Sequence, residues 1–276
     1  MVDLTMARLQ EFMIVLYALG LVFYLIDYFK KQKAVQRIAF WLIVAVWVTQ
    51  TAILTLYIVE MKRFPVLSLV EGIYFYVWLL VTLSIVFQLI YKVNFMVFFM
   101  NIIGFVFLMI HVFSNLKYTA STVGDSLVSE VLFIHITTAI LSYAVFALAF
   151  VFGVLYLIVY KVLKKKKFTK QFSSLPNLHQ TMMGMKMSIY TGIPILFVSL
   201  IFGVQWAYVA LTDWSIFDVK IMGSFAVLLF YTGVIYFHYK GKLQSLEFAW
   251  MSIFAFLFTV VNFFLGSTLS QFHLWI

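Results

Sequence analysis

Residues 191–220 read TGIPILFVSLIFGVQWAYVALTDWSIFDVK, a long apolar run with a tryptophan-rich, acidic end. A helix needs about 20 predominantly apolar residues to cross a bilayer, and this run is long enough. Four aromatic and two acidic residues stand around its end: Trp206, Tyr208, Asp213, Trp214, Phe217 and Asp218. Aromatic side chains are enriched where a membrane meets water. The stretch therefore predicts a transmembrane helix that ends in an aromatic interfacial segment.

The whole chain has the composition of a protein whose solvent is lipid. Of its 276 residues, 65% are hydrophobic and only 11% are charged, which is too little polar surface for a soluble protein of this size. The sequence contains no cysteine, and this excludes disulfides, thiolate metal sites and a covalently attached c-type haem. We therefore predict an all-α integral membrane protein.

Eight apolar runs are long enough to span a bilayer. They lie at residues 12–29, 38–59, 66–91, 94–114, 131–160, 187–212, 220–239 and 247–269. A cleavable signal peptide begins with a basic region, whereas this N-terminus carries the acidic residues Asp3 and Glu11. We therefore expect the first run to remain as a transmembrane helix. No linker or internal repeat divides the chain, and one polytopic domain over residues 1–276 is expected.

Basic residues gather in alternate loops. The first, third, fifth and seventh loops carry 14 of the 19 lysines and arginines, while the opposite side carries eight of the ten acids. The positive-inside rule places the basic loops in the cytoplasm and both termini outside. This pattern also explains the net charge of +9 as a topology signal, so no nucleic-acid partner is expected. A bacterial plasma membrane is the predicted location.

Two histidines are predicted to meet at the outer face. His135 opens the fifth span on a helical stripe with Thr138, Ala139 and Ser142, and His273 follows the eighth span. Two external imidazoles beside an aromatic segment, in a chain without thiolates, suit a haem whose iron takes two axial nitrogens. The alternative is that each is an interfacial histidine bonded to water or backbone.

Further residues would surround such a haem. We expect Trp206, Trp214 and Phe217 to stack on the macrocycle or shield it. Its propionates would pair with one of three basic residues, Lys117, Lys220 or Arg63. His238, at the inner end of the seventh span, is a candidate ligand for a haem in transit from the inside, and a snorkelling interfacial histidine is the alternative there.

The segment that follows residue 205 resembles the WWD motif of the CcsA/CcmC/CcmF group of haem-handling membrane proteins, W-A-x-x-x-W-G-x-x-W-x-W-D-P-K-E. Trp206, Ala207, Asp218 and Lys220 match that motif, and Phe217 stands for a tryptophan. Five positions depart from it, at Leu211, Thr212, Ser215, Val219 and Ile221. The motif is thus degenerate, and the resemblance adds Asp218 to the residues expected to contact haem.

The histidines carry the same resemblance. His135 precedes Leu141, Ser142, Tyr143 and Ala144 in the family's H-x-x-x-x-x-L-S-Y-A context. His273 follows Gly266 and Leu269 as the family's second external histidine does. The resemblance implies that these two histidines are axial ligands of a non-covalent haem b, and that His238 matches a third, membrane-embedded histidine. It covers about residues 130–273 as a haem-handling core.

The eight spans, the small size and the degenerate motif are most similar to the HemX branch. That resemblance implies a role in tetrapyrrole biosynthesis or cytochrome c assembly, with cytochrome c assembly proteins or glutamyl-tRNA reductase as partners. Two alternatives stay open. One is a scaffold that regulates the abundance of such a soluble enzyme through the cytoplasmic loop at 161–186, and the other is a haem transporter. No P-loop, nucleophile elbow, HExxH or dinucleotide glycine pattern is present, so no enzyme is predicted.

Overall fold

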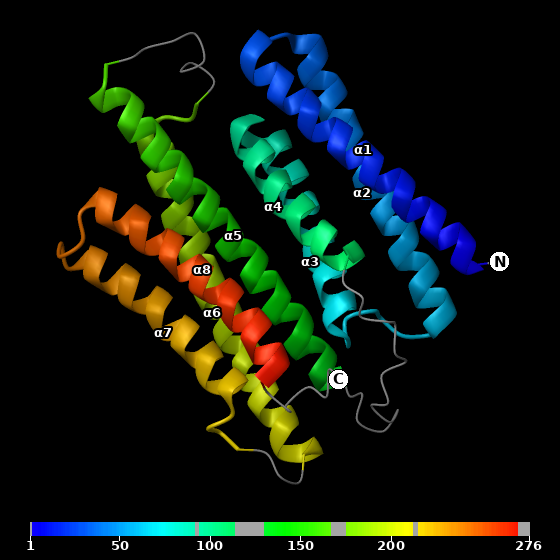
Figure 1. Cartoon of the computed structure of the whole chain (residues 1–276). Helices are drawn as coiled ribbons and strands as arrows, with labels where there is room; N and C mark the ends of the chain where they lie inside the picture. The colour runs from blue at the N-terminus through cyan, green and yellow to red at the C-terminus, as the bar shows by residue number, and fades with distance from the viewer. Residues whose placement is uncertain (1, 92–93, 114–129, 167–174, 212–214, 270–276) are drawn as a thin grey trace. The chain divides into compact units, whose positions relative to one another are not determined.

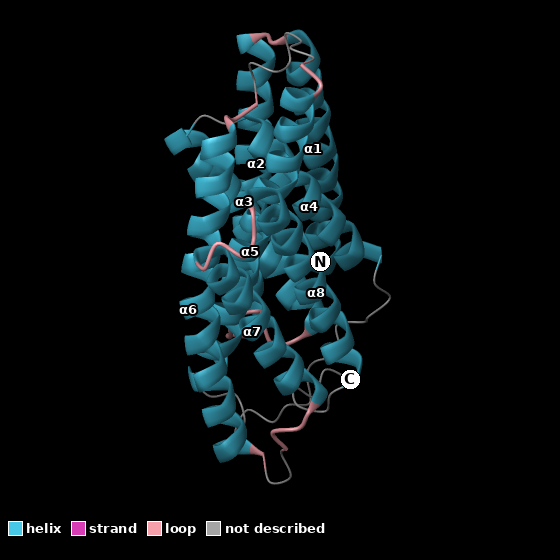
Figure 2. Ribbon diagram, turned by 90° about the vertical axis from the view of Figure 1, so that its left-hand side faces the viewer, coloured by secondary structure: helices cyan, strands magenta, loops and turns pink. Residues whose placement is uncertain are grey.

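The computed structural model describes residues 2–91, 94–113, 130–166, 175–211 and 215–269, and these are helical apart from short connections (Figures 1 and 2). Eight helices occur in those ranges: α1 (Val2–Lys30), α2 (Lys33–Met61), α3 (Leu69–Tyr91), α4 (Asn94–Phe113), α5 (Glu130–Lys164), α6 (Leu178–Ala210), α7 (Val219–Tyr239) and α8 (Ser245–Leu269). Each is long and apolar enough to cross a membrane. The predicted all-α class and its eight spans are confirmed.

Helix α6 begins nine residues before the apolar run that predicted it, and a capping box explains the difference. The Asn177 side chain accepts a hydrogen bond from the Gln180 backbone N–H at 2.7 Å, and the Gln180 side chain accepts one from the Asn177 N–H at 3.1 Å. Such a pair satisfies donors at a helix start whatever the hydropathy of the turn. From there α6 continues without a break through Pro194.

The chain forms two compact units. Unit 1 comprises residues 1–65, 73–115 and 165–176, and unit 2 comprises residues 66–72, 116–164 and 177–276. Unit 1 therefore contains α1, α2, α4 and most of α3, while unit 2 contains α5, α6, α7 and α8. Most of the family resemblance falls in unit 2, as do His135 and His238, whereas His273 lies outside the described residues.

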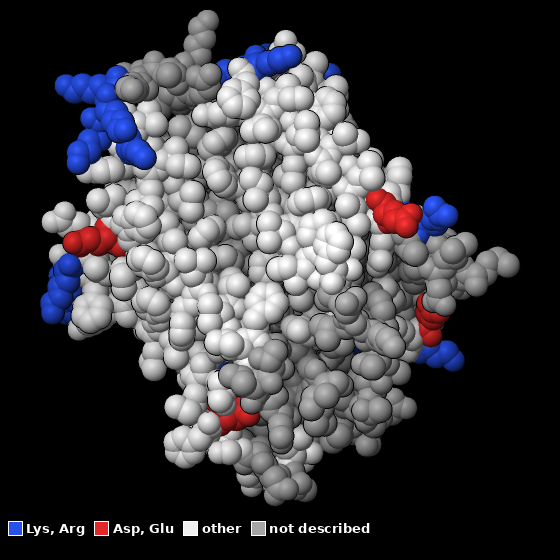
Figure 3. All heavy atoms as spheres, viewed as in Figure 1, with Lys and Arg blue, Asp and Glu red and all other residues white. Residues whose placement is uncertain are grey.

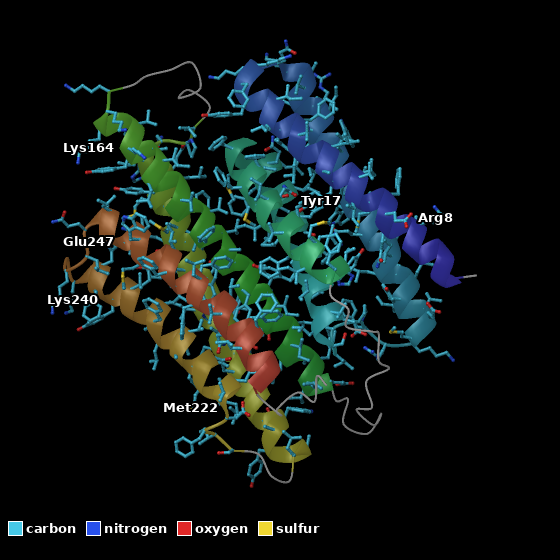
Figure 4. The ribbon with its side chains drawn as sticks, in the orientation of Figure 1. Arg8, Tyr17, Lys164, Met222, Lys240 and Glu247 are labelled. Atoms are coloured by element: carbon cyan, nitrogen blue, oxygen red, sulfur yellow. The ribbon has the colours of Figure 1, made fainter. Side chains whose placement is uncertain are left out.

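Polar side chains join the helices of unit 1. Tyr17 of α1 donates to Asn101 Oδ1 of α4 at 3.1 Å, and Asn101 Nδ2 donates to Ser84 Oγ of α3 at 2.9 Å (Tyr17 is labelled in Figure 4). Trp78 of α3 donates to Thr51 of α2 at 2.9 Å. Hydrogen bonds of this kind hold helices together in a membrane, where lipid provides no hydrophobic drive between them.

Unit 2 is built around α5, which packs along α6 and α8 (Figure 1). Small residues set the spacing, because a Cβ on Gly192 of α6 would meet the ring of Phe146 of α5. Phe146 in turn stacks on Tyr231 of α7, with ring centroids 3.8 Å apart. Close backbone approach at glycine is a regular feature of membrane helix pairs. These contacts place the middle of α5 against α6 and α7.

Three charged residues mark one end of unit 2. Lys164 at the end of α5, Lys240 at the end of α7 and Glu247 at the start of α8 lie at one end of the unit, and Met222 marks the opposite part of α7 (Figure 4). The surface between is largely uncharged on the face shown in Figure 3. Of the four loops that the charge pattern assigned to one side, the fifth and the seventh begin at this same end of unit 2. That this end is cytoplasmic stays a prediction.

Candidate functional site

His135 lies in the second turn of α5 and is 8% exposed. Its ring Nδ1 is 2.7 Å from the backbone carbonyl oxygen of Ser199 in α6, and the Ser199 hydroxyl donates to the His135 carbonyl at 2.8 Å. A carbonyl oxygen only accepts, so Nδ1 carries the proton and Nε2 carries the lone pair. A histidine that binds a metal commonly donates its other ring N–H to a backbone carbonyl in this way.

Gly203 makes this contact possible. It lies one helical turn after Ser199, and a Cβ built on it would be 2.5 Å from Cε1 and 3.0 Å from Nε2 of His135. The imidazole therefore lies against bare backbone of α6, where any side chain at residue 203 would displace it. The sequence analysis did not select Ser199 or Gly203. Their only sequence signal is the spacing of a serine and a glycine four residues apart on an apolar helix.

A cavity of about 60 Å³ lies beside His135 between the four helices of unit 2. Much of its lining is apolar, with Leu196, Leu200, Phe225 and Phe263 among the residues that form it. Five polar residues also reach it: His135, Tyr143, Lys220, Ser224 and Asn262. A volume of this size holds a few water-sized atoms. The structure thus brings the predicted residues His135 and Lys220 to one cavity.

Lys220 enters this cavity from the first turn of α7. Its Nζ atom is buried, and its side chain packs against Gly266 of α8, where a Cβ would be 3.2 Å from Lys220 Cγ. Asp218 caps the same helix, since its Oδ1 accepts the Lys220 backbone N–H at 2.8 Å. The capping bond gives Asp218 a structural role, and its predicted contact with haem stays a prediction.

The aromatic residues of the predicted haem contacts separate in the structure. Trp206 is 5% exposed within unit 2, whereas Phe217 is 78% exposed, and neither lines the cavity. Trp214 and His273 lie outside the described residues, as does Lys117. The pairing of His135 with His273 therefore stays a prediction, because His273 lies outside the described residues. Arg63 belongs to unit 1.

His238 lies at the far end of α7 from Lys220. The two residues are 18 positions apart along the helix, about 27 Å at 1.5 Å per residue. Its Nδ1 is 2.9 Å from the carbonyl oxygen of Leu243, and its ring packs on Phe248 at 4.4 Å. The imidazole thus stabilises the turn between α7 and α8. The structure does not bring His238 to the cavity, and its role as an inner haem ligand stays a prediction.

Comparison with known proteins shows the family to which this chain belongs. A family model described as Cytochrome C assembly protein matches residues 66–273, which contain every helix that lines the cavity. The chain belongs to the cytochrome c assembly protein family. Protein HemX of Bacillus subtilis (strain 168) is 44% identical over 273 residues, covering 99% of both chains. Protein HemX of Brevibacillus brevis is 34% identical over 267 residues, covering 97% of both.

Family membership and the eight apolar helices make this a multi-pass bacterial membrane protein of the HemX type. The expected resemblance to the HemX branch is confirmed, and it extends over nearly the whole chain. The family match begins at residue 66, well before the segment at 130–273 in which the motif resemblance was found.

Proposed function

We propose that this protein holds one haem b non-covalently on unit 2 and acts in tetrapyrrole biosynthesis or cytochrome c assembly. His135 is one axial ligand and His273 is the other. The observation that carries the proposal is the contact of His135 Nδ1 with the Ser199 carbonyl, which leaves the Nε2 lone pair as the one that can ligate iron.

The donor chemistry at the cavity fits haem. His135 offers a neutral imidazole nitrogen, and Lys220 offers a buried ammonium next to it for a carboxylate. The cavity of about 60 Å³ does not enclose a macrocycle, so the body of the ligand lies outside it. A haem held here supplies a redox-active iron or is itself the molecule that is carried or sensed. Among the residues the structure describes, no three His, Asp or Glu side chains form a site for a bare metal ion.

The absorption spectrum of the purified protein tests this proposal. Two nitrogen ligands predict a six-coordinate, low-spin spectrum for the wild type. His135→Ala and His273→Ala are each expected to give a five-coordinate or water-ligated iron, and the double variant is expected to lose haem. His179→Ala is the matched control, because His179 is exposed near the start of α6.

The outcome that contradicts the proposal is specific. If both single variants keep the Soret and α bands of the wild type, the two histidines are structural residues. Loss of haem from His179→Ala as well would show that histidine substitution disturbs the fold in general. In either case the assignment of His135 as a ligand would be withdrawn.

A second candidate function is a membrane scaffold that controls the abundance of a soluble tetrapyrrole enzyme such as glutamyl-tRNA reductase. The observation that favours it is a cluster of exposed lysines at the end of α5: Lys161, Lys164, Lys165 and Lys166. Such a cluster also suits anionic lipid headgroups. Binding of the soluble enzyme by a peptide of residues 161–186 alone would support the scaffold.

A further inference from the structure

We propose that the cavity of unit 2 is a carboxylate subsite in which Lys220, Asn262 and Ser224 bind one carboxylate group. This inference rests on the proposed function, and on that basis the carboxylate is a haem propionate.

The Lys220 side chain turns inward although neighbouring side chains on its helix face outward. It is the second residue of α7, and its neighbours Val219 and Met222 are both exposed. A lysine near a helix end in a membrane normally extends its ammonium toward the interface. Here Nζ is buried instead. Burial of an ammonium is unfavourable in itself, and its place in the first turn of a helix adds repulsion from the helix dipole. Asp218 at the N-cap of α7 offsets part of this cost electrostatically, and a carboxylate bound in the cavity would add to that stabilisation.

The polar groups that share the cavity with the ammonium are neutral and include hydrogen-bond donors. Asn262 contributes an amide, Ser224 and Tyr143 contribute hydroxyls, and among the described residues no acidic side chain lines the cavity. The acidic neighbour of Lys220 is Asp218, which acts on it electrostatically from the N-cap of α7, where one of its oxygens accepts a backbone N–H. The cavity therefore combines a cation with neutral donors, which is the chemistry that recognises a carboxylate.

Two glycines make room for the Asn262 and Lys220 side chains. A Cβ on Gly223 of α7 would overlap the amide oxygen Oδ1 of Asn262 of α8, and a Cβ on Gly266 of α8 would press on the Lys220 side chain. Asn262 Nδ2 also lies 3.4 Å from Ser224 Oγ, so its amide is oriented toward the α7 side of the cavity. Lys220 of α7 thus packs against α8 at Gly266, and Asn262 of α8 packs against α7 at Gly223.

The cavity is large enough for a carboxylate group and too small for a whole haem. Its volume of about 60 Å³ has room for a carboxylate, which has three heavy atoms, in place of a few waters. His135 lines the same cavity, so an iron ligand and a carboxylate subsite are neighbours. A haem carries both an iron, which the imidazole would ligate, and propionates, which the carboxylate subsite would bind.

The test compares haem with its dimethyl ester, in which both propionates are neutral. The purified full-length protein is titrated with each, as wild type, Lys220→Met and Lys220→Arg. We expect the wild type to bind free-acid haem about tenfold to a hundredfold more tightly than the ester, the range of one charge-assisted hydrogen bond. Lys220→Met should lose this preference and Lys220→Arg should keep part of it. Lys242→Met, an exposed lysine beyond α7, is the matched control.

Each remaining outcome separates the subsite from the proposed function. If Lys220→Met weakens haem and ester equally, Lys220 is a structural residue and the subsite is wrong. If the wild type binds neither haem nor the ester, the proposed function fails. The carboxylate subsite is then tested by the melting temperature of the protein in sodium propionate. A propionate-dependent rise in melting temperature in the wild type but not in Lys220→Met would retain the subsite for a free carboxylate. No rise would overturn it.

Discussion

At the scale of single residues, the notable feature of His135 is that backbone atoms orient it. The Ser199 carbonyl accepts from Nδ1, and the absent side chain of Gly203 leaves room for the ring. A backbone carbonyl cannot be removed by substitution of Ser199, so the glycine is the better point of attack. His238 differs from His135 because its Nδ1 contacts the Leu243 carbonyl in the turn that directly follows its own helix, and not the backbone of a distant helix.

The first prediction at this scale concerns Gly203→Ala. The added methyl would overlap the His135 ring, so we expect a lower haem content and loss of the six-coordinate spectrum in an otherwise folded protein. Gly233→Ala is the control, because nothing lies within 4 Å of a Cβ at Gly233 of α7. That substitution should leave the spectrum unchanged and stabilise the protein by up to about 1 kcal/mol through helix propensity. A wild-type spectrum in Gly203→Ala would show that ring placement does not depend on the glycine.

At the scale of helices, α7 and α8 are held by a contact between a glycine and an amide. Asn262 occupies the space that a side chain on Gly223 would take, and it reaches Ser224 at 3.4 Å. Asparagine within a transmembrane helix is costly unless it finds a partner on a neighbouring helix. The cavity beside His135 therefore depends on the fit between these two helices.

A double-mutant cycle tests this fit. We expect Gly223→Ala to destabilise the protein by about 1–3 kcal/mol, the usual cost of overpacking, measured as a lower melting temperature in detergent. In an Asn262→Ala background the clash partner is gone, so Gly223→Ala should then cost close to nothing. If the two losses simply add, the glycine and the amide do not interact, and the described contact is not the one that holds the helices.

At the scale of the whole molecule, the charge pattern predicts the orientation of the protein in the membrane. In unit 2 the ends of α5 and α7 share one side with the start of α8, as the pattern requires (Figure 4). The positive-inside rule makes that side cytoplasmic. A haem on the other side would then face the exterior.

Cysteine labelling tests the orientation without background, because the chain has no cysteine. Ser215→Cys and Lys242→Cys place single thiols at exposed residues beyond opposite ends of α7. An impermeant thiol reagent applied to intact cells should label residue 215 and spare residue 242, and permeabilised cells should show both labelled. Labelling of residue 242 alone in intact cells would invert the topology.

The sequence by itself determined the class of the protein, its eight spans and its family. Hydropathy is a local property, so a run of about 20 apolar residues predicts a helix without knowledge of its neighbours. The sequence also selected His135 and Lys220, because a polar group in such a run needs a reason to be there. The hydropathy pattern placed the start of α6 nine residues too late, because a capping box works through two side chains and not through hydropathy.

Only the tertiary structure decided how the site is made. The partner of His135 is 64 residues away along the chain, and the partner of Gly223 is Asn262 on another helix. Ser199 and Gly203 look like ordinary small residues of an apolar helix until α5 is packed against them. Lys220 and Asp218 are neighbours in the sequence, yet one enters the cavity and the other caps α7. Helical packing, which sets the direction of each side chain, is what assigns these roles.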